Sequence, residues 1–466
     1  MATKRKDVAR AYISYRNERT REREKNSDLL RLIKMKAAAQ QIENQNANVD
    51  EQSFGGRMGE ANSAMMKKLA LDEFVSPMAR KNHEENLIYI HDLDHYVVGD
   101  HNCLSIPFDD LLAKGFNTRQ TDVRPANSVN TAFQLVAVIF QLQSLQQFGG
   151  VSATHLDWTM VPYVRKSFFK HFQDGRKYIS HWTIKEDEDF SSEMSIEDPK
   201  YKTFAEAYEY AMDMTQRELR QAVEGMFHNL NTLQSRSGNQ LPFTSINYGT
   251  CTLPEGRMVI KAILEGSIKG VGKLHKTSIF PCQIFQYMKG VNDKPGTPNY
   301  DLYRLALEST AKRLYPNYAN VDWSGNAGYD RNDPTTYFST MGCRTANGMD
   351  INAESGVNPQ RKDGRGNICP VTIILPELAM SAKARFVRDL DYINTEQGQR
   401  DLFDFFYGKL DQKISEAREM LKERFEWICA QNAASAKFMY ENGTMMGYHP
   451  EEGIRSALKH GTLAVG

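Results

Sequence analysis

Residues 363–380 read DGRGNICPVTIILPELAM, a glycine-bearing polar turn followed by a run of apolar, β-forming residues. This run predicts a buried strand that ends at Pro376. Asn367 and Cys369 stand two positions apart at its start, so we expect their side chains to face the same side of a sheet. Strand ends are where α/β folds place functional groups, which favours a ligand contact for Asn367. An asparagine in a glycine-rich turn can equally serve only its own backbone.

Further strands and helices alternate on both sides of this stretch. Alternating or β-rich segments predict strands in 87–96, 241–253, 278–288 and 461–466. Apolar residues at helical spacing predict helices over 5–44, 126–147, 200–235, 301–314 and 397–440. Asparagine, glycine and serine predict loops over 45–63 and 316–342. Strands separated by long helices indicate an α/β fold.

The composition narrows the class of protein. Lysine plus arginine and aspartate plus glutamate number 58 each, so no net charge favours direct binding to nucleic acid or to an anionic membrane. The basic N-terminus has no apolar signal segment, and no stretch is apolar for the roughly 18 residues of a membrane span. Scattered cysteines do not form a disulfide framework, which indicates a reducing cytoplasm. They are Cys103, Cys251, Cys282, Cys343, Cys369 and Cys429.

Two cysteines stand in chemically suggestive surroundings. Cys343 lies in STMGCRTANG (339–348), a polar stretch that predicts a loop tip, and its neighbour Arg344 could lower the pKa of the thiol. Cys103, in HNCLSIP (101–107), follows a run of ionisable residues. Neither has a second cysteine two or three positions away, which excludes a CxxC motif. The two could act on one substrate, whereas the usual fate of a cysteine is a buried, inert thiol.

The segment HDLDHYVVGDH (91–101) allows several interpretations. His91, Asp94 and His95 would share one helix face and could bind a metal, as in a metallohydrolase. The β-forming Val97-Val98 and the following glycine argue against a helix there. The other interpretations are structural, hydrogen-bonded histidines, or a histidine that orients a small acid in an active site.

Several longer motifs together resemble one family, the anaerobic (class III) ribonucleoside-triphosphate reductases. The resemblance extends over nearly the whole chain. Its motifs are MGCRTANG (341–348), IYIHDLDHY (88–96), HNCLSIP (101–107), LPFTSINYGT (241–250), KTSIFPCQIF (276–285) and DGRGNICPVTIILPELA (363–379).

The resemblance implies a ten-stranded α/β barrel of the glycyl-radical-enzyme type, with a finger loop that carries Cys343 into its centre. Cys343 would form the thiyl radical that abstracts the ribose 3′-hydrogen. Cys103 would supply hydrogen at the 2′ position. His91 and Asn367 would hold formate, the reductant that leaves as carbon dioxide, although Cys369 leaves open a dithiol reductant. Ser245 and Asn247 are expected to contact the substrate.

The same resemblance implies partners. Ribonucleoside triphosphates would be the substrates, and dNTP and ATP the effectors. A radical-SAM activase with an Fe-S cluster would generate the glycyl radical. The helix in 126–147 corresponds to the dimer-interface region, so a homodimer is expected. The protein would work in the cytoplasm of a bacterium, or be phage-encoded in a bacterial host.

The sequence also departs from the family pattern. Residues 1–44 resemble only the final helix of the ATP-cone, which divides the chain into that segment and a catalytic barrel over 45–466. The zinc motifs and the glycyl-radical segment are not found in these residues, and Gly447-Tyr448 only superficially resembles the latter. We therefore expect a barrel incomplete at its C-terminus, zinc not bound by this chain, and a C-terminal fragment as partner. The alternative is an inactive or regulatory subunit that binds nucleotides and dimerises without turnover.

Overall fold

The computed structural model describes residues 54–181, 189–236, 240–342, 345–386 and 390–466. Eight strands in these ranges form one mixed sheet in the order β1-β9-β2-β5-β6-β7-β8, with β10 paired to β9. Their bounds are β1 Ile88–Ile90, β2 Cys103–Ser105, β5 Val151–Ala153, β6 Thr244–Tyr248, β7 Cys282–Tyr287, β8 Asn317–Asn320, β9 Gly366–Ile373 and β10 Thr462–Val465. A separate small hairpin joins β3 (Phe116–Asn117) to β4 (Asp122–Val123).

Helices connect the strands. Those of eight or more residues are α2 Phe54–Leu69, α3 Pro77–Glu84, α5 Val129–Ser144, α7 Val161–Tyr178, α9 Ala205–Leu230, α10 Pro254–Lys269, α11 Tyr300–Arg313, α12 Leu375–Phe386 and α14 Glu396–Cys429. The shorter ones are α4 Phe108–Lys114, α6 Leu156–Thr159, α8 Pro199–Lys202, α13 Leu390–Ile393, α15 Lys437–Tyr440 and α16 Arg455–Leu458. No helix in the described ranges combines the length and apolar character needed to cross a bilayer.

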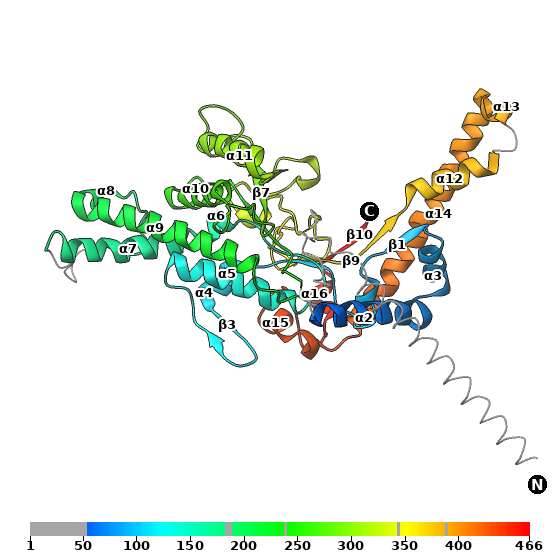
Figure 1. Cartoon of the computed structure of the whole chain (residues 1–466), viewed down its shortest axis with the longest axis horizontal. Helices are drawn as coiled ribbons and strands as arrows, with labels where there is room; N and C mark the ends of the chain where they lie inside the picture. Colours follow the sequence, from blue (N-terminus) through cyan, green and yellow to red (C-terminus); the bar gives the residue numbers. More distant parts are fainter. Residues whose placement is uncertain (1–53, 182–188, 237–239, 343–344, 387–389) are drawn as a thin grey trace, which may run out of the picture.

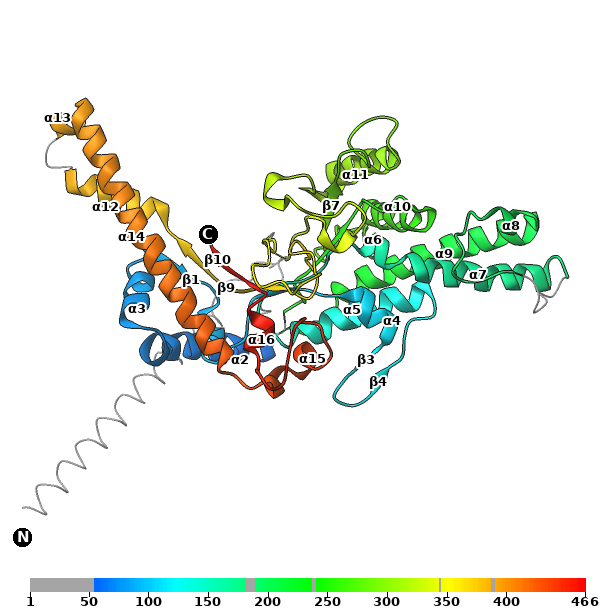
Figure 2. The same ribbon diagram turned by 180° about the vertical axis from the view of Figure 1, so that it is seen from behind.

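The sheet has two parts that run in different senses. Strands β2, β5, β6, β7 and β8 are parallel, because helical crossovers connect them in sequence order. Strand β9 pairs antiparallel with both β2 and β1, and β10 runs parallel to β9. In Figures 1 and 2, helices α7–α9 extend from one end of the molecule and α12–α14 from the other. The α/β class and the incomplete barrel-type sheet are therefore confirmed.

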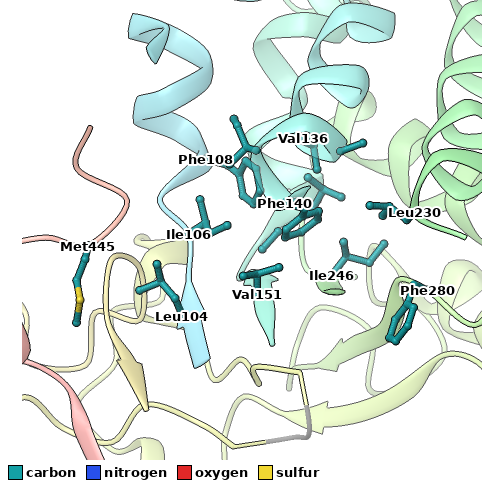
Figure 3. Packing of buried hydrophobic residues seen from close by; sticks show 14 of the residues in the cluster. Leu104, Ile106, Phe108, Val136, Phe140, Val151, Leu230, Ile246, Phe280 and Met445 are labelled. Atoms are coloured by element: carbon teal, nitrogen blue, oxygen red, sulfur yellow. The ribbon is translucent and has the colours of Figure 1, made fainter. Parts of the chain in front are cut away.

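The main core lies on the helix-covered face of the parallel strands. Leu104, Val151 and Ile246 come from three neighbouring strands and are fully buried. Figure 3 shows them on the side that Val136 and Phe140 of α5 cover. Because side chains alternate along a strand, Cys103, Ser152, Ser245 and Asn247 face the other way, into the curve of the sheet. The apolar outer residues thus fix which polar residues point inward.

Two segments predicted as loops contain regular structure. Helix α2 begins at Phe54, inside the predicted loop 45–63. Ser63 donates to Asp94 Oδ2 at 2.5 Å, so a tertiary contact supports this helix despite its glycine and serine content. Strand β8 lies inside the predicted loop 316–342, and it forms because its backbone pairs with the edge of β7. The predicted helix over 5–44 lies outside the described residues.

Two boundaries also differ from the prediction, and two short strands are additional. Strand β9 ends at Ile373, and α12 already begins at Leu375, so the last residues of the predicted strand are helical. Helix α14 ends at Cys429 rather than near residue 440. Strands β2 and β5 were not predicted, because three residues are too few to show an alternating pattern.

Candidate active site

A cavity of about 1470 Å³ opens on the inner face of the sheet. Its wall includes residues from β1 and β9 on one side and from β7 and β8 on the other. The lining residues used below are His91, Asn102, Cys103, Gly150, Gly342, Asn367 and Thr372. Cys103 and Asn367 are directly opposite one another across the β2–β9 pair. The structure thus brings together two residues that lie far apart in the sequence.

The thiol of Cys103 is held by short backbone segments. Gly150 N–H donates to Cys103 Sγ at 3.3 Å, and the thiol donates to Asn102 Oδ1 at 3.2 Å. The buried Gln147 donates to the carbonyl oxygens of Asn102 and Gly150 at 2.7 and 3.0 Å. These bonds fix the direction in which Cys103 projects, because both chain segments that contact the sulfur are themselves tied down.

The loop that leads to position 343 approaches Cys103 at Gly150. A Cβ built on Gly150 would lie 2.7 Å from the Cα of Gly342, so the two glycines touch through their backbones. Beyond them, Met341 N–H donates to Thr345 O at 2.7 Å. Cys343 and Arg344 lie outside the described residues. The glycine before Cys343 therefore contacts the residue whose N–H binds the Cys103 sulfur.

Asn367 is the polar group most directly available to a ligand. It is 1% exposed, and its Oδ1 atom has no hydrogen-bond partner among the described residues. A buried carbonyl oxygen without a hydrogen-bond partner costs about 1–3 kcal/mol of folding stability. Such an atom is therefore a candidate for a hydrogen bond to a ligand or a bound water molecule. His91 lines the same cavity and is hydrogen-bonded through Nε2 to Thr372 Oγ1 at 2.8 Å.

A buried arginine holds the backbone of His91. Arg424, on α14, donates to His91 O at 2.7 Å and to Asp92 O at 3.4 Å, and Asp92 has a left-handed φ of 45°. The guanidinium also lies 5.1 and 5.0 Å from the ring centres of Tyr96 and Phe148. Helix α14 thus supports the turn that directs His91 to the cavity, a contact that sequence reasoning missed because 333 residues separate the two.

Ser245 and Asn247 lie on the inner face of β6 but bind the loop backbone. Gly342 N–H donates to Ser245 Oγ at 3.1 Å. Asn247 accepts from Thr340 N–H at 3.0 Å and donates to Thr340 O and Ala153 O at 3.0 and 2.9 Å. Their expected contact with a substrate stays a prediction, and neither residue is among those that line the cavity.

The sequence matches the profile of the anaerobic ribonucleoside-triphosphate reductase family over residues 45–466. The chain belongs to this family. It is 28% identical to the anaerobic ribonucleoside-triphosphate reductase of Haemophilus influenzae over 100% of this chain, and 29% identical to that of Escherichia coli over 99%. It covers 59% and 58% of those two proteins. The reductase of enterobacteria phage T4 is 28% identical over 91% of this chain and 62% of its own length.

Solved structures of the family share the fold. The anaerobic ribonucleotide reductase of Thermotoga maritima in complex with dATP and CTP matches with a TM-score of 0.55 at 14% identity, over 95% of this chain and 66% of that one. The same enzyme with glycerol in the active site gives 0.56 at 14% identity, over 89% and 58%. The resemblance drawn from the sequence motifs is confirmed at the level of family and fold. The predicted division at residues 44 and 45 stays a prediction.

One detail of the site corrects the sequence interpretation. Asn367 and Cys369 do not face the same side. On β10, consecutive residues Thr462 and Leu463 pair with Asn367 and Cys369, so β9 carries an extra residue between them. Such a bulge reverses the alternation of side chains. Cys369 therefore turns away from the cavity towards α14, where its Sγ lies 3.7 Å from Leu421 O and burial raises the pKa of the thiol to about 12.

The histidine cluster does not form a common ligand set. His91 binds Thr372, Asp94 binds Ser63, and His95 Nδ1 lies 2.8 Å from Asp100 Oδ2. In the described ranges of the chain, no three His, Cys, Asp or Glu side chains are grouped so that they could hold a metal ion. The three side chains of the metallohydrolase alternative point to three different partners.

A second polar cluster joins the two parts of the sheet. His155, at the end of β5, contacts Asp109 Oδ2 at 3.0 Å and Asp363 Oδ2 at 3.9 Å, and Thr154 Oγ1 donates to Asp363. Burial lowers the pKa of His155, but Asp109 and Asp363 raise it further, to about 9. Burial raises the pKa of Asp363 to about 6. The turn before β9 is thereby tied to the parallel strands.

Proposed function

We propose that this chain forms the catalytic barrel part of an anaerobic ribonucleoside-triphosphate reductase that reduces ribonucleotides by thiyl-radical chemistry. Family membership supports the reaction class. The observation that best supports the position of the active site is the contact of Gly342 with Gly150, whose N–H binds the sulfur of Cys103. It brings the residue before Cys343 to a thiol that faces Asn367 across two paired strands.

The roles of the residues follow from the reaction. The Cys343 thiyl radical takes the hydrogen atom from C3′ of the ribose and becomes a thiol. The 2′-hydroxyl leaves as water once it is protonated, and Cys103 supplies the hydrogen atom that C2′ then requires. Cys343 returns its hydrogen to C3′. Overall, one ribonucleotide, one formate and one proton yield a deoxyribonucleotide, carbon dioxide and water.

His91 and Asn367 are proposed to hold formate. The Asn367 amide can donate an N–H to a carboxylate, and its group is already buried, so little further desolvation is required on binding. Both residues line the cavity beside Cys103. Formate bound there would reach the thiol that has to be reduced in each turnover. The buried position of Cys369 on the opposite face favours formate over a dithiol formed with that cysteine.

The glycyl radical of this family supplies the oxidising equivalent that converts the Cys343 thiol into a thiyl radical. We propose that it reaches the barrel from a segment outside this 466-residue chain, after generation by a radical-SAM activase. Ribonucleoside triphosphates are the proposed substrates and dNTP or ATP the proposed effectors, by analogy with the Thermotoga enzyme bound to dATP and CTP. A bacterial cytoplasm is the proposed setting, since the Haemophilus, Escherichia and phage T4 relatives come from bacteria and a bacteriophage. A homodimer is proposed from the resemblance of the helix in 126–147 to the family's dimer-interface region.

Anaerobic reconstitution tests this function. The chain is combined with a segment that carries the family's zinc and glycyl-radical motifs, the activase, formate and CTP, and dCTP formation is measured together with carbon dioxide from labelled formate. We expect one carbon dioxide per dCTP. Cys343→Ser and Cys103→Ser should each abolish the product while leaving nucleotide binding intact.

Two results would contradict the proposal. Product formation that survives Cys343→Ser would remove the thiyl mechanism. Nucleotide binding and dimerisation without any turnover, in a mixture where a full-length relative is active, would instead identify the chain as a binding or regulatory subunit.

A further inference from the structure

The inner face of β6 and β7 carries a row of buried amide and hydroxyl side chains that bind one stretch of backbone. Gln286 donates to Phe338 O at 3.0 Å, Asn247 exchanges two hydrogen bonds with Thr340, and Ser245 accepts from Gly342 N–H. Every second loop residue is bound, as expected for an extended segment. Thr340 is bound to Asn247 and Gly342 to Ser245, so the loop runs antiparallel to β6.

These contacts replace the main-chain pairing that a neighbouring strand would provide. All three side chains are completely buried. If one of them is removed, water cannot replace its hydrogen bonds to the loop backbone. Asn247 also donates to Ala153 O, and Gln286 also donates to Thr154 O, both at the end of β5. The row is therefore fixed to the sheet on its other side.

The far flank of the loop is held separately. Asn347 donates to Lys362 O and Arg365 O, both at 3.0 Å, and Lys362 Nζ donates back to Asn347 O at 2.9 Å. Arg365 also donates to Gly348 O at 3.0 Å. These partners precede β9, the strand of Asn367. The loop is thus tied to the β6–β7 strands before position 343 and to the β9 turn after it.

We propose that Asn247 and Ser245 are positioning residues, which hold residues 338–342, the segment that leads to Cys343, against the sheet beside Gly150 and Cys103, and that they do not contact the substrate. The assignment rests on the proposed function for the role of Cys343, whereas the anchoring itself can be measured without turnover. The glycine contact between Gly150 and Gly342 sets how closely the anchored loop approaches, because neither position has room for a side chain.

Hydrogen exchange of the full chain tests the anchoring. In Asn247→Ala, amides in 338–342 should exchange at least about tenfold faster, because the Thr340 N–H loses its acceptor. Ser245→Ala removes one bond and should affect chiefly Gly342. Asn299→Ala is the matched control, since Asn299 is equally buried and also donates to two carbonyls, those of Gly249 and Cys251, away from the loop. Unchanged exchange in both loop variants, or an equal rise in the control, would overturn the proposal.

Steady-state kinetics in the reconstituted enzyme supply the second readout. A displaced loop should lower kcat at least about tenfold and leave the KM for the ribonucleotide within about twofold. A raised KM with unchanged kcat would assign Ser245 and Asn247 to the substrate and overturn the proposal. If the unaltered chain does not turn over but the exchange pattern is as expected, the anchoring stands and the proposed function fails.

Discussion

The inner face of β6 and β7, here the β6–β7 side, and the β1–β9 side of the cavity both carry polar side chains, and each contains one buried asparagine. On the β6–β7 side (Ser245, Asn247 and Gln286), Asn247 makes three hydrogen bonds to backbone. On the β1–β9 side (His91, Asn367 and Thr372), Asn367 has an Oδ1 atom without a partner among the described residues. Two asparagines of similar burial thus differ in use. Asn247 holds the protein's own backbone, whereas the Oδ1 atom of Asn367 is available to a ligand.

This difference separates scaffold from binding surface. A buried amide that is fully hydrogen-bonded stabilises the fold and offers nothing to a ligand. A buried amide that lacks partners costs stability, and it persists when binding or catalysis requires it. The two asparagines should therefore respond to substitution in opposite ways, one in stability and the other in activity.

The largest expected effect is on the β1–β9 side. Asn367→Ala should lower formate-dependent turnover by at least about 100-fold, because the formate-holding amide is lost. Its free energy of unfolding should change by no more than about 1 kcal/mol, since Oδ1 forms no bond that could be broken. Turnover in the reconstituted enzyme and urea unfolding of the chain alone measure the two quantities. A large loss of stability would show that Asn367 is a structural residue.

On the β6–β7 side, stability should change most. Asn247→Ala removes three hydrogen bonds and leaves the N–H and C=O of Thr340 buried without partners, which should cost about 3 kcal/mol of unfolding free energy. Urea unfolding measures this beside Asn367→Ala and the control Asn299→Ala. Equal stability losses in Asn247→Ala and Asn367→Ala would contradict the distinction between the two sides.

The sequence predicted this comparison only in part. Motifs identified Asn367 and Asn247 as site residues by family resemblance, and the run after Asn367 predicted a buried strand. Nothing local shows that Asn247 would bind Thr340, 93 positions away, because that bond depends on where the loop returns to the sheet. The bulge after Asn367 was also invisible, since it arises from pairing with β10 and not from the composition of β9. Gly150, just after the predicted helix 126–147, has no local signal of a role, although it contacts both Cys103 and Gly342.

A third prediction concerns the link between the two sides. Thr154 accepts from Gln286 through its carbonyl and donates to Asp363 through its hydroxyl, beside His155. His155 keeps its proton in the folded protein up to a pKa of about 9, whereas an unfolded histidine loses it near 6.5. The folded state then binds more protons between these values, so stability should fall by about 2 kcal/mol as the pH rises from 6.5 to 9.

Urea unfolding at pH 6, 7.5 and 9 checks this pH dependence, with His155→Gln as the reference. The difference between the chain and the variant is the relevant quantity, because burial lowers the pKa of Lys362 to about 8 and this group acts in the opposite sense above that pH. The difference should be largest at pH 6 and shrink towards pH 9. A difference that is constant with pH would mean that His155 is not held protonated by Asp109 and Asp363.

The smallest effect is expected at Cys369, two residues from Asn367 but on the opposite face of β9. Cys369→Ala should leave formate-dependent turnover within about twofold, because the thiol packs near Leu421 and does not line the cavity. The lost packing should cost only about 1 kcal/mol of unfolding free energy. A loss of turnover like that of Asn367→Ala, at this small cost in stability, would show that Cys369 reaches the cavity and acts as a reductant. The boundary between binding surface and scaffold would then lie one residue beyond the bulge, and the assignment of formate to Asn367 would have to be replaced by a dithiol.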